Sequence, residues 1–231
     1  MLAIIPARRN SKGLKNKNIL NLNGKPLISY SITEALKSKL ISRVIVVTDC
    51  LKIAEISQKF GAEVPFIRPK HLATDNSMII DTYIYTLEFL KNKKQVYKEF
   101  VSLLPTSPLR TSYDIDESIK LFKKKKAKSL ISVTNLDKPV EWNLLLSKKL
   151  KIRKYLKNNS AILNRQSYKT LFVPNGSIYI FNYFFLKKTR EYYNNRTYGY
   201  FMPNYKSVDI DEDIDFKLAE ILIKNNLKTT N

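Results

Sequence analysis

LAIIPARRNSKGLKNKN, residues 2–18, runs from an apolar segment straight into a strongly basic loop. Residues 2–5 are apolar throughout, which is typical of a strand that is buried on both faces. The next twelve residues, 7–18, gather five basic side chains around Ser11 and Gly13, namely Arg8, Arg9, Lys12, Lys15 and Lys17. Ligands of open α/β sheets bind beyond the carboxyl ends of the strands. The stretch therefore predicts a buried first strand followed by an anion-binding loop.

Strand-like and helix-like patterns alternate from this stretch to about residue 135. Further β-rich runs occur at 44–48, 64–67, 100–104 and 130–134. Amphipathic helical patterns lie between them, at 26–40, 51–60, 78–92 and 114–126. This alternation predicts an α/β fold with a mostly parallel sheet and helices on both faces. A strand at 176–181 and a final helix at 213–225 complete the expected elements.

Residues 140–172 break the alternation, because apolar and basic runs follow one another there with neither a helical nor a strand period. We expect one domain over residues 1–231, with 140–172 as an insertion. Since this segment has no obvious place in a parallel sheet, we expect it to form much of a homodimer contact.

The composition limits the class of protein. The chain has 231 residues, 44% of them hydrophobic, and a formal net charge of +21. This charge is explained either by a polyanionic partner or by a lysine-rich, solvated surface. No apolar run approaches the roughly 20 residues of a membrane helix, and no signal peptide is expected at the N-terminus. One cysteine, Cys50, excludes an internal disulfide and favours a reducing cytoplasm.

The basic loop has the residue types of a phosphate site. Gly13 permits a tight backbone path, Arg8 can bind phosphate oxygens with two parallel hydrogen bonds, and Lys17 can supply a point charge. Ser11 and Asn18 add neutral donors. The set suits a triphosphate, although it matches neither a P-loop nor a dinucleotide fingerprint. The alternative is a solvated basic loop.

A second candidate site is the acidic stretch SVDIDEDIDF, residues 207–216. In an extended segment Asp209 and Asp211 share a face, so both can bind one cation, and Mg²⁺ prefers few carboxylates together with phosphate oxygens. The alternative is capping of the final helix, to which we assign Asp213 and Asp215.

Four blocks of sequence resemble one family, in its expected order. They are IIPARRNSKGLKNKN at 4–18, LLPTSPLR at 103–110, PNGSIYIF at 174–181 and SVDIDEDIDF at 207–216, and RPKHLATD at 68–75 is also similar. The family is that of the CMP-sialic acid synthetases, or acylneuraminate cytidylyltransferases, with relatives that activate legionaminic, pseudaminic and 3-deoxy-manno-octulosonic acids. The resemblance implies a Rossmann-like nucleotide-diphospho-sugar transferase fold and a homodimer.

The resemblance also implies a set of site residues. The CTP phosphates would be held by Arg8, Ser11, Lys12, Lys17 and Asn18, and the cytosine by Asn76 and Ser77. The sugar acid would be bound by Thr106, Ser107, Arg165, Asn175 and Tyr179. The family's metal pair matches Asp209 and Asp211, which would hold Mg²⁺. Arg110 ends the second block and would either orient its loop or cap a helix.

The implied reaction is attack of the anomeric hydroxyl of a 2-keto nonulosonic acid on the α-phosphate of CTP, with release of pyrophosphate. Arg8, Lys17 and Asp211 are the expected catalytic residues. The family often has Gln and Arg where this chain has Leu104 and Val173, so the acceptor could be another sugar acid, such as 3-deoxy-manno-octulosonate. We expect a cytoplasmic enzyme of surface polysaccharide biosynthesis, without nucleic-acid or membrane partners. The alternatives are a transferase for a sugar phosphate and, from another class, a basic nucleic-acid-binding module.

Overall fold

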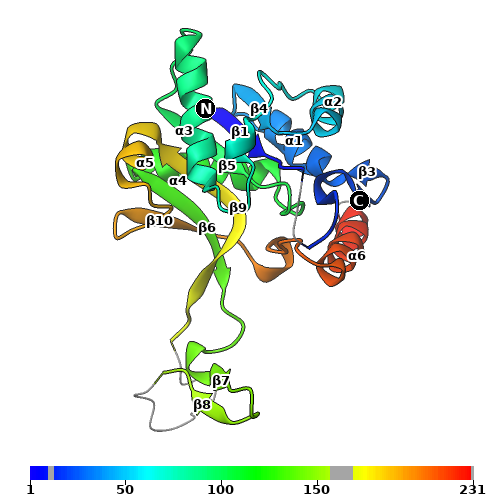
Figure 1. The fold of residues 1–231 in the computed structure, drawn as a ribbon, viewed down its shortest axis with the longest axis vertical. Coiled ribbons are helices and arrows are strands. Elements are labelled where there is room, and N and C mark those ends of the chain that lie inside the picture. The colour runs from blue at the N-terminus through cyan, green and yellow to red at the C-terminus, as the bar shows by residue number, and fades with distance from the viewer. Residues whose placement is uncertain (10–12, 157–168, 230–231) are drawn as a thin grey trace.

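The N-terminal apolar run forms the strand β1 (Leu2–Pro6), which lies next to the edge strand β4 in a six-stranded sheet of order β10-β6-β9-β5-β1-β4 (Figure 1). The computed structural model describes residues 1–9, 13–156 and 169–229. β1 pairs in parallel with both neighbours, and all five of its residues are buried. The other strands of this sheet are β4 (Arg43–Val47), β5 (Glu99–Leu103), β6 (Ser129–Asn135), β9 (Phe172–Asn182) and β10 (Thr197–Phe201).

Only β9 runs against the rest of the sheet, because it pairs antiparallel with both β5 and β6. The reversal follows from the insertion. The chain leaves the sheet at the end of β6 and returns along β9, which lies beside β6 and runs in the opposite direction. The pair Asn135 and Phe172 marks the place where the two strands separate. The expected mostly parallel sheet is therefore confirmed, with one reversed strand.

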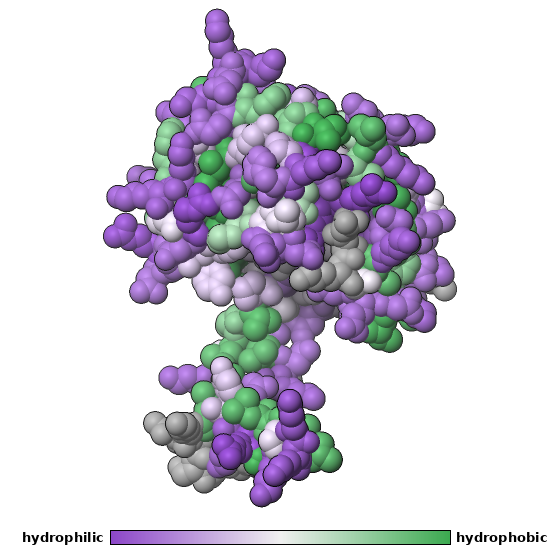
Figure 2. Space-filling view, viewed as in Figure 1, coloured by the Kyte–Doolittle hydropathy of each residue, from purple (hydrophilic) through white to green (hydrophobic). Residues whose placement is uncertain are grey.

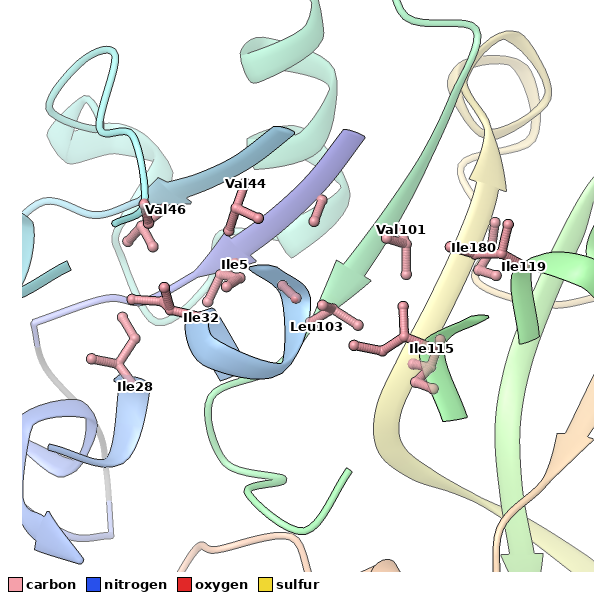
Figure 3. Packing of buried hydrophobic residues seen from close by; sticks show 14 of the residues in the cluster. Ile5, Ile28, Ile32, Val44, Val46, Val101, Leu103, Ile115, Ile119 and Ile180 are labelled. Atoms are coloured by element: carbon pink, nitrogen blue, oxygen red, sulfur yellow. The ribbon is translucent and has the colours of Figure 1, made fainter. Parts of the chain in front are cut away.

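Helices cover both faces of the sheet, as predicted. They are α1 (Leu27–Lys37), α2 (Leu51–Lys59), α3 (Ile79–Asn92), α4 (Ser112–Lys124), α5 (Tyr183–Thr189) and α6 (Asp213–Thr229). Ala3 and Ile5 of β1 pack in one core cluster with residues of α1, α2 and α4, and Figure 3 shows Ile32 and Ile115 pointing into it. Leu2 and Ile4 pack on the opposite face with α3 and α5. The alternation along β1 thus divides the core into two layers.

A third, smaller cluster anchors the C-terminal helix α6. Ala219 of α6 and Ile210 before it pack against Leu22 and Leu27. Leu22 belongs to a short hairpin of β2 (Asn21–Leu22) and β3 (Lys25–Pro26) that precedes α1. This packing brings the acidic stretch 207–216 next to the basic N-terminal loop.

The described part of the segment 140–172, residues 140–156 and 169–172, projects away from the main body (Figure 1). It contains a hairpin of β7 (Leu144–Leu146) and β8 (Ile152–Lys154), whose six residues are all exposed. Figure 2 shows apolar surface on this projection, and Leu144, Leu145 and Leu146 are 54%, 53% and 65% exposed. We call this described part, residues 140–156 and 169–172, the arm.

Two sequence expectations need correction. Residues 64–67 do not form a strand, because only isolated bridges, Ile45 with Glu63 and Thr48 with Ile67, join this region to β4. Pro65 within it has no N–H to donate to a ladder. The strand β10 and the short helix α5 were not expected. Four of the five residues of β10 are aromatic or β-branched, but the pattern analysis did not recognise the strand.

None of the helices in the described part of the chain is long and apolar enough to cross a membrane.

Arg110 holds the loop after β5 in place from inside the protein. Its side chain is 2% exposed, and it donates from Nη1 to the Ser177 carbonyl and from Nη2 to Ser31 Oγ, both at 2.6 Å. Burial lowers the pKa of Arg110 to about 10, so the guanidinium remains charged at neutral pH. Arg110 therefore orients the loop that connects β5 to α4, and of the two roles considered from the sequence the structure supports this one.

Replacing Arg110 should destabilise the fold. In Arg110→Leu the buried Ser177 carbonyl and Ser31 hydroxyl lose their donor, so we expect a loss of about 2–4 kcal/mol in the free energy of unfolding, measured with urea. Lys120→Leu is the control, because Lys120 pairs with Glu117 on an exposed helix face and the change should cost about 1 kcal/mol or less. Equal losses in the two variants would contradict the role given to Arg110.

Candidate active site

A cavity of about 910 Å³ opens at the carboxyl ends of β1 and β5. The basic loop, the segment 68–79, the loop after β5 and the acidic stretch all contribute to its wall. The lining residues are Pro6, Arg8, Gly13, Lys17, Asn18, Arg68, Leu72, Thr74, Asp75, Ser77, Met78, Ile79, Thr82, Leu104, Pro105, Thr106, Tyr192, Asp211 and Glu212. Six of the predicted site residues are among them: Arg8, Lys17, Asn18, Ser77, Thr106 and Asp211.

Lys17 is a buried cation near the N-terminus that bonds to residues near the C-terminus. Only 8% of its side chain is exposed, and Nζ donates to the Ile210 carbonyl at 2.5 Å and to Asp211 Oδ1 at 2.8 Å. The side chain of Asp211 itself is 76% exposed and lines the cavity. The pair therefore fixes a positive charge at the wall and leaves most of the carboxylate accessible.

Two glycines allow the acidic stretch to approach the sheet. A Cβ on Gly13 would lie 2.1 Å from the backbone oxygen of Asp211. Gly176 has a φ of +73°, and a Cβ there would lie 2.6 Å from Asp209 Oδ2. Both contacts are too close for any side chain, so these positions require glycine.

Asp209 lies in a more confined place than Asp211. Desolvation raises the pKa of Asp209, and the negative charge of Asp211 adds to the effect, whereas a hydrogen bond with Thr106 opposes it. The backbone is fixed here as well, because Ile210 N donates to the Thr106 carbonyl at 2.8 Å. The raised pKa marks a position where a nearby cation would stabilise the carboxylate.

The remaining aspartates of this stretch serve helix α6. Asp215 Oδ2 accepts hydrogen bonds from the backbone N–H groups of Asp211 at 3.0 Å and Glu212 at 2.8 Å, which confirms the predicted capping role. Asp213 pairs with Lys217 one turn later, at 2.6 Å. Of the predicted metal pair, Asp211 lines the cavity, whereas Asp209 lies outside the lining, against Thr106 and Gly176.

These two carboxylates fit a magnesium ion that shares its ligands with a phosphate. Mg²⁺ keeps several waters and commonly takes only one or two protein carboxylates when a phosphate is present. The described residues contain no group of three or more histidine, cysteine, aspartate or glutamate side chains that could hold a metal without such help. Asp209 and Asp211 could therefore hold the ion together with a bound triphosphate.

Arg8 and Asn18 shape the basic loop. Asn18 is buried, and its Nδ2 donates to the Arg8 carbonyl at 3.0 Å, so it holds the loop backbone. The Arg8 guanidinium donates from Nη1 to Asp75 Oδ1 at 2.9 Å. In this structure Asn18 is thus a support for Arg8.

Arg68 is a cavity residue that the pattern analysis did not single out, although the block RPKHLATD contains it. Its side chain is 5% exposed, and desolvation lowers its pKa, an effect that Asp49 opposes. Nothing in the described part of the chain accepts a hydrogen bond from its Nε. The available signal was a basic residue immediately after the apolar run 64–67, which a surface loop would also produce.

The predicted sugar-acid residues divide into two groups. Thr106 lines the cavity, and Ser107 beside it is buried, with an Oγ that no described residue hydrogen-bonds. Tyr179 is half-buried, packs 5.9 Å from the ring of Tyr192 at the cavity wall, and has a pKa that burial raises to about 12.

Asn175, by contrast, is used within the protein. It accepts from Ser132 Oγ at 2.6 Å and donates to Ser207 Oγ at 2.9 Å, and so ties β9 to β6 and to the acidic stretch. Asn76 is exposed and does not line the cavity. Their predicted ligand contacts stay predictions. Ser11, Lys12 and Arg165 lie outside the described residues.

Several curated proteins with similar sequences are named as cytidylyltransferases or as CMP-sugar-acid synthases. The chain is 36% identical over 230 residues to N-acylneuraminate cytidylyltransferase of Escherichia coli O18:K1:H7, which covers 95% of this chain and 51% of that protein. It therefore spans about half the length of that relative. It is 32% identical to CMP-N,N'-diacetyllegionaminic acid synthase of Legionella pneumophila, with 98% of this chain and 97% of that protein covered.

Another relative of matching length is post-translational flagellin modification protein B of Campylobacter coli. It is 34% identical to the chain, with 97% of this chain and 95% of that protein covered.

Solved structures agree on the fold. A CMP:2-keto-3-deoxy-manno-octonic acid synthetase in complex with CTP superposes with a TM-score of 0.71 at 14% identity, covering 97% of this chain and 98% of the other. A 4-diphosphocytidyl-2C-methyl-D-erythritol synthase of Anaerococcus prevotii superposes with a TM-score of 0.61 at 13% identity, covering 96% and 95%. At these identities the likeness shows a shared α/β fold.

A family model described as cytidylyltransferase matches residues 2–229, nearly the whole chain. Together with relatives of matching length at more than 30% identity, this match confirms the resemblance seen in the sequence blocks. The chain belongs to the cytidylyltransferase family.

Proposed function

We propose that the enzyme transfers CMP from CTP to the anomeric hydroxyl of a 2-keto nonulosonic acid and releases pyrophosphate, with Mg²⁺ as cofactor. The observation that carries this proposal is the convergence of Arg8 and Lys17 from the basic loop with Asp211 from the acidic stretch at one cavity. Phosphoryl transfer needs mainly positioning and charge neutralisation from the protein, and this set provides both.

The basic side chains have distinct parts in the proposed reaction. Lys17 is held by Ile210 and Asp211, so its charge stays at the wall where a triphosphate would lie. Arg8 is more exposed and can bind two phosphate oxygens at once through its planar guanidinium. Together they would stabilise the charge that moves onto the departing pyrophosphate.

Asp209 and Asp211 are the proposed magnesium ligands. When bound there with the triphosphate, the ion would neutralise phosphate charge and lower the pKa of the attacking hydroxyl. Thr106 and Gly176 would keep Asp209 in position, and Lys17 would do the same for Asp211.

The names of the relatives support a nonulosonic acid as the acceptor. The sequence relatives named for sialic and legionaminic acids are 36% and 32% identical to the chain, whereas the 3-deoxy-manno-octonic acid synthetase is 14% identical. Leu104 lines the main cavity, whereas Val173 lines a separate hollow of about 470 Å³ beside Asn204 and Ser207. Of these two departures, it is therefore Leu104 that borders the proposed CTP site.

The arm is the proposed homodimer contact. The three leucines of β7 are more than half exposed to solvent. Burying these apolar side chains against a second copy of the chain would be favourable. The arm stands apart from the main body, so it can reach a neighbouring subunit (Figure 1).

CTP should be the preferred nucleotide. With a panel of sugar acids and the four nucleoside triphosphates, we expect pyrophosphate release with CTP to exceed release with ATP, GTP or UTP by about tenfold or more, because a site that hydrogen-bonds one base rejects the others. Within the panel, nonulosonic acids should exceed 3-deoxy-manno-octulosonate. Equal release with all four nucleotides would remove the assignment to CTP.

Asp211→Asn separates metal binding from a purely structural role. The amide oxygen can still accept from Lys17, so the melting temperature should change little. Loss of the negative charge should reduce CTP turnover on the order of 10²-fold, with partial recovery at higher Mg²⁺. Asp215→Asn is the matched control, since the amide oxygen of asparagine can still accept the two backbone hydrogen bonds, and it should keep near wild-type turnover. Wild-type turnover in Asp211→Asn would assign Asp211 a structural role.

A change on the arm should weaken the dimer. Leu144 and Leu146 lie on the same face of β7, so Leu144→Asp combined with Leu146→Asp places two charges in the proposed contact. Light scattering at micromolar concentration should show a dimer for the wild type and a shift toward monomer for this variant. Lys148→Glu, in the turn of the same hairpin, is the charge-change control. A wild type that is monomeric and fully active would refute the proposal.

A further inference from the structure

Asp49 lies at the end of β4, next to the cavity but outside its lining, and connects two segments that reach it. Its Oδ1 accepts a hydrogen bond from the Arg9 backbone N–H at 2.8 Å. The same oxygen forms an ion pair with Arg68 Nη2 at 3.4 Å. The backbones of these segments are already anchored to β4, because Ala7 N donates to the Val47 carbonyl and Arg68 N donates to the Thr48 carbonyl. With both backbones fixed, the direction of the Arg68 side chain depends on Asp49.

The burial of Arg68 makes this direction important. A guanidinium that is 5% exposed cannot turn to water, and Asp49 is the carboxylate that pairs with it. Its Nε has no acceptor in the described part of the chain, while the residue lines the cavity. Arg68 is thus a buried cation at the cavity wall whose Nε–H can donate a hydrogen bond to a ligand. The positive charge of Arg8 nearby contributes to the lowering of the Arg68 pKa.

Arg8 has a carboxylate partner of a different kind. Its pair with Asp75 has side chains that are 33% and 56% exposed, whereas those of Arg68 and Asp49 are 5% and 21% exposed. An exposed pair contributes little stability and exchanges its partners readily, whereas breaking a buried pair leaves an uncompensated charge. The two aspartates therefore differ in whether a phosphate can replace them.

We propose that Asp49 is a positioning residue of the nucleotide site, which aims the Arg68 guanidinium into the cavity and holds the Arg9 backbone, while Asp75 is an exchangeable counter-ion that Arg8 leaves for the nucleotide phosphates. The inference rests on the proposed binding of CTP in this cavity. Asp49 stays paired with Arg68 when the nucleotide binds, whereas Asp75 competes with the nucleotide phosphates for Arg8.

The two roles predict effects of opposite sign for the same chemical change. Simple electrostatics predicts that removing either negative charge near the cavity strengthens binding of a triphosphate. Under the proposal, Asp75→Asn strengthens binding because it frees Arg8, but Asp49→Asn weakens it because Arg68 loses its orientation. The opposite signs therefore distinguish positioning from a general charge effect.

The experiment measures the KM for CTP and kcat by pyrophosphate release, and the Kd for CTP alone by calorimetry. Asp49→Asn should raise KM and Kd about tenfold with little change in kcat, because a contact made equally in the ground and transition states affects binding only. Asp75→Asn should lower both constants about threefold. Glu63→Gln, which removes a carboxylate that pairs with Arg43 away from the cavity, is the control and should change neither.

The outcomes separate this inference from the proposed function. If the wild type does not bind CTP in calorimetry, the proposed function fails, and the inference fails with it. If the wild type binds CTP and both aspartate variants bind it more tightly, the inference alone is overturned. If Asp49→Asn does not fold, the exposed Asp75→Asn still decides, since unchanged or weaker CTP binding by that variant contradicts its role as an exchangeable counter-ion.

Discussion

The site depends on one buried interaction between residues that are almost two hundred positions apart. Lys17 donates to the Ile210 carbonyl and pairs with Asp211, at sequence separations of 193 and 194 residues. A buried ammonium requires such partners, because desolvation without them is costly. The acidic stretch must therefore lie against the basic loop. At Gly13 a side chain would collide with the backbone oxygen of Asp211, and at Gly176 it would collide with the Asp209 carboxylate. The packing of α6 beside β2 and α1 supports this arrangement.

A common pattern of charge follows around the cavity. Arg8, Arg68 and Lys17 each pair with one aspartate, namely Asp75, Asp49 and Asp211, and each aspartate comes from a different segment. The pairs hold the cations in place without a bound nucleotide, and they differ in exposure. The two buried cations, Lys17 and Arg68, have fixed positions, whereas the more exposed Arg8 can change partners. Such preorganisation suits a reaction in which charge moves between phosphate oxygens.

The outer parts of the molecule follow from the same sheet. β9 runs antiparallel because the chain leaves the sheet after β6 and returns from the arm, so the insertion is attached by two paired strands of the central sheet. Arg110 ties the loop after β5 to β9 and α1 from within the core. The arm can thus carry an exposed apolar surface without disturbing the cavity, since the strands that connect it are anchored in the sheet.

The sequence by itself determined the α/β class, most of the helices and sheet strands and the basic character of the loop after β1, because periodicity and local charge are properties of short segments. It also indicated the family, through blocks spread along the chain. The tertiary structure decided what depends on contacts between distant segments. Residues 64–67 have a strand-like composition but do not form a strand. Asn175 has hydrogen-bond partners on β6 and in the acidic stretch, and Arg68, in a stretch that a surface loop would also produce, is buried at the cavity beside Asp49. The physical reason is that the burial and partners of a polar side chain are set by the elements packed around it, and a local pattern carries no record of those elements.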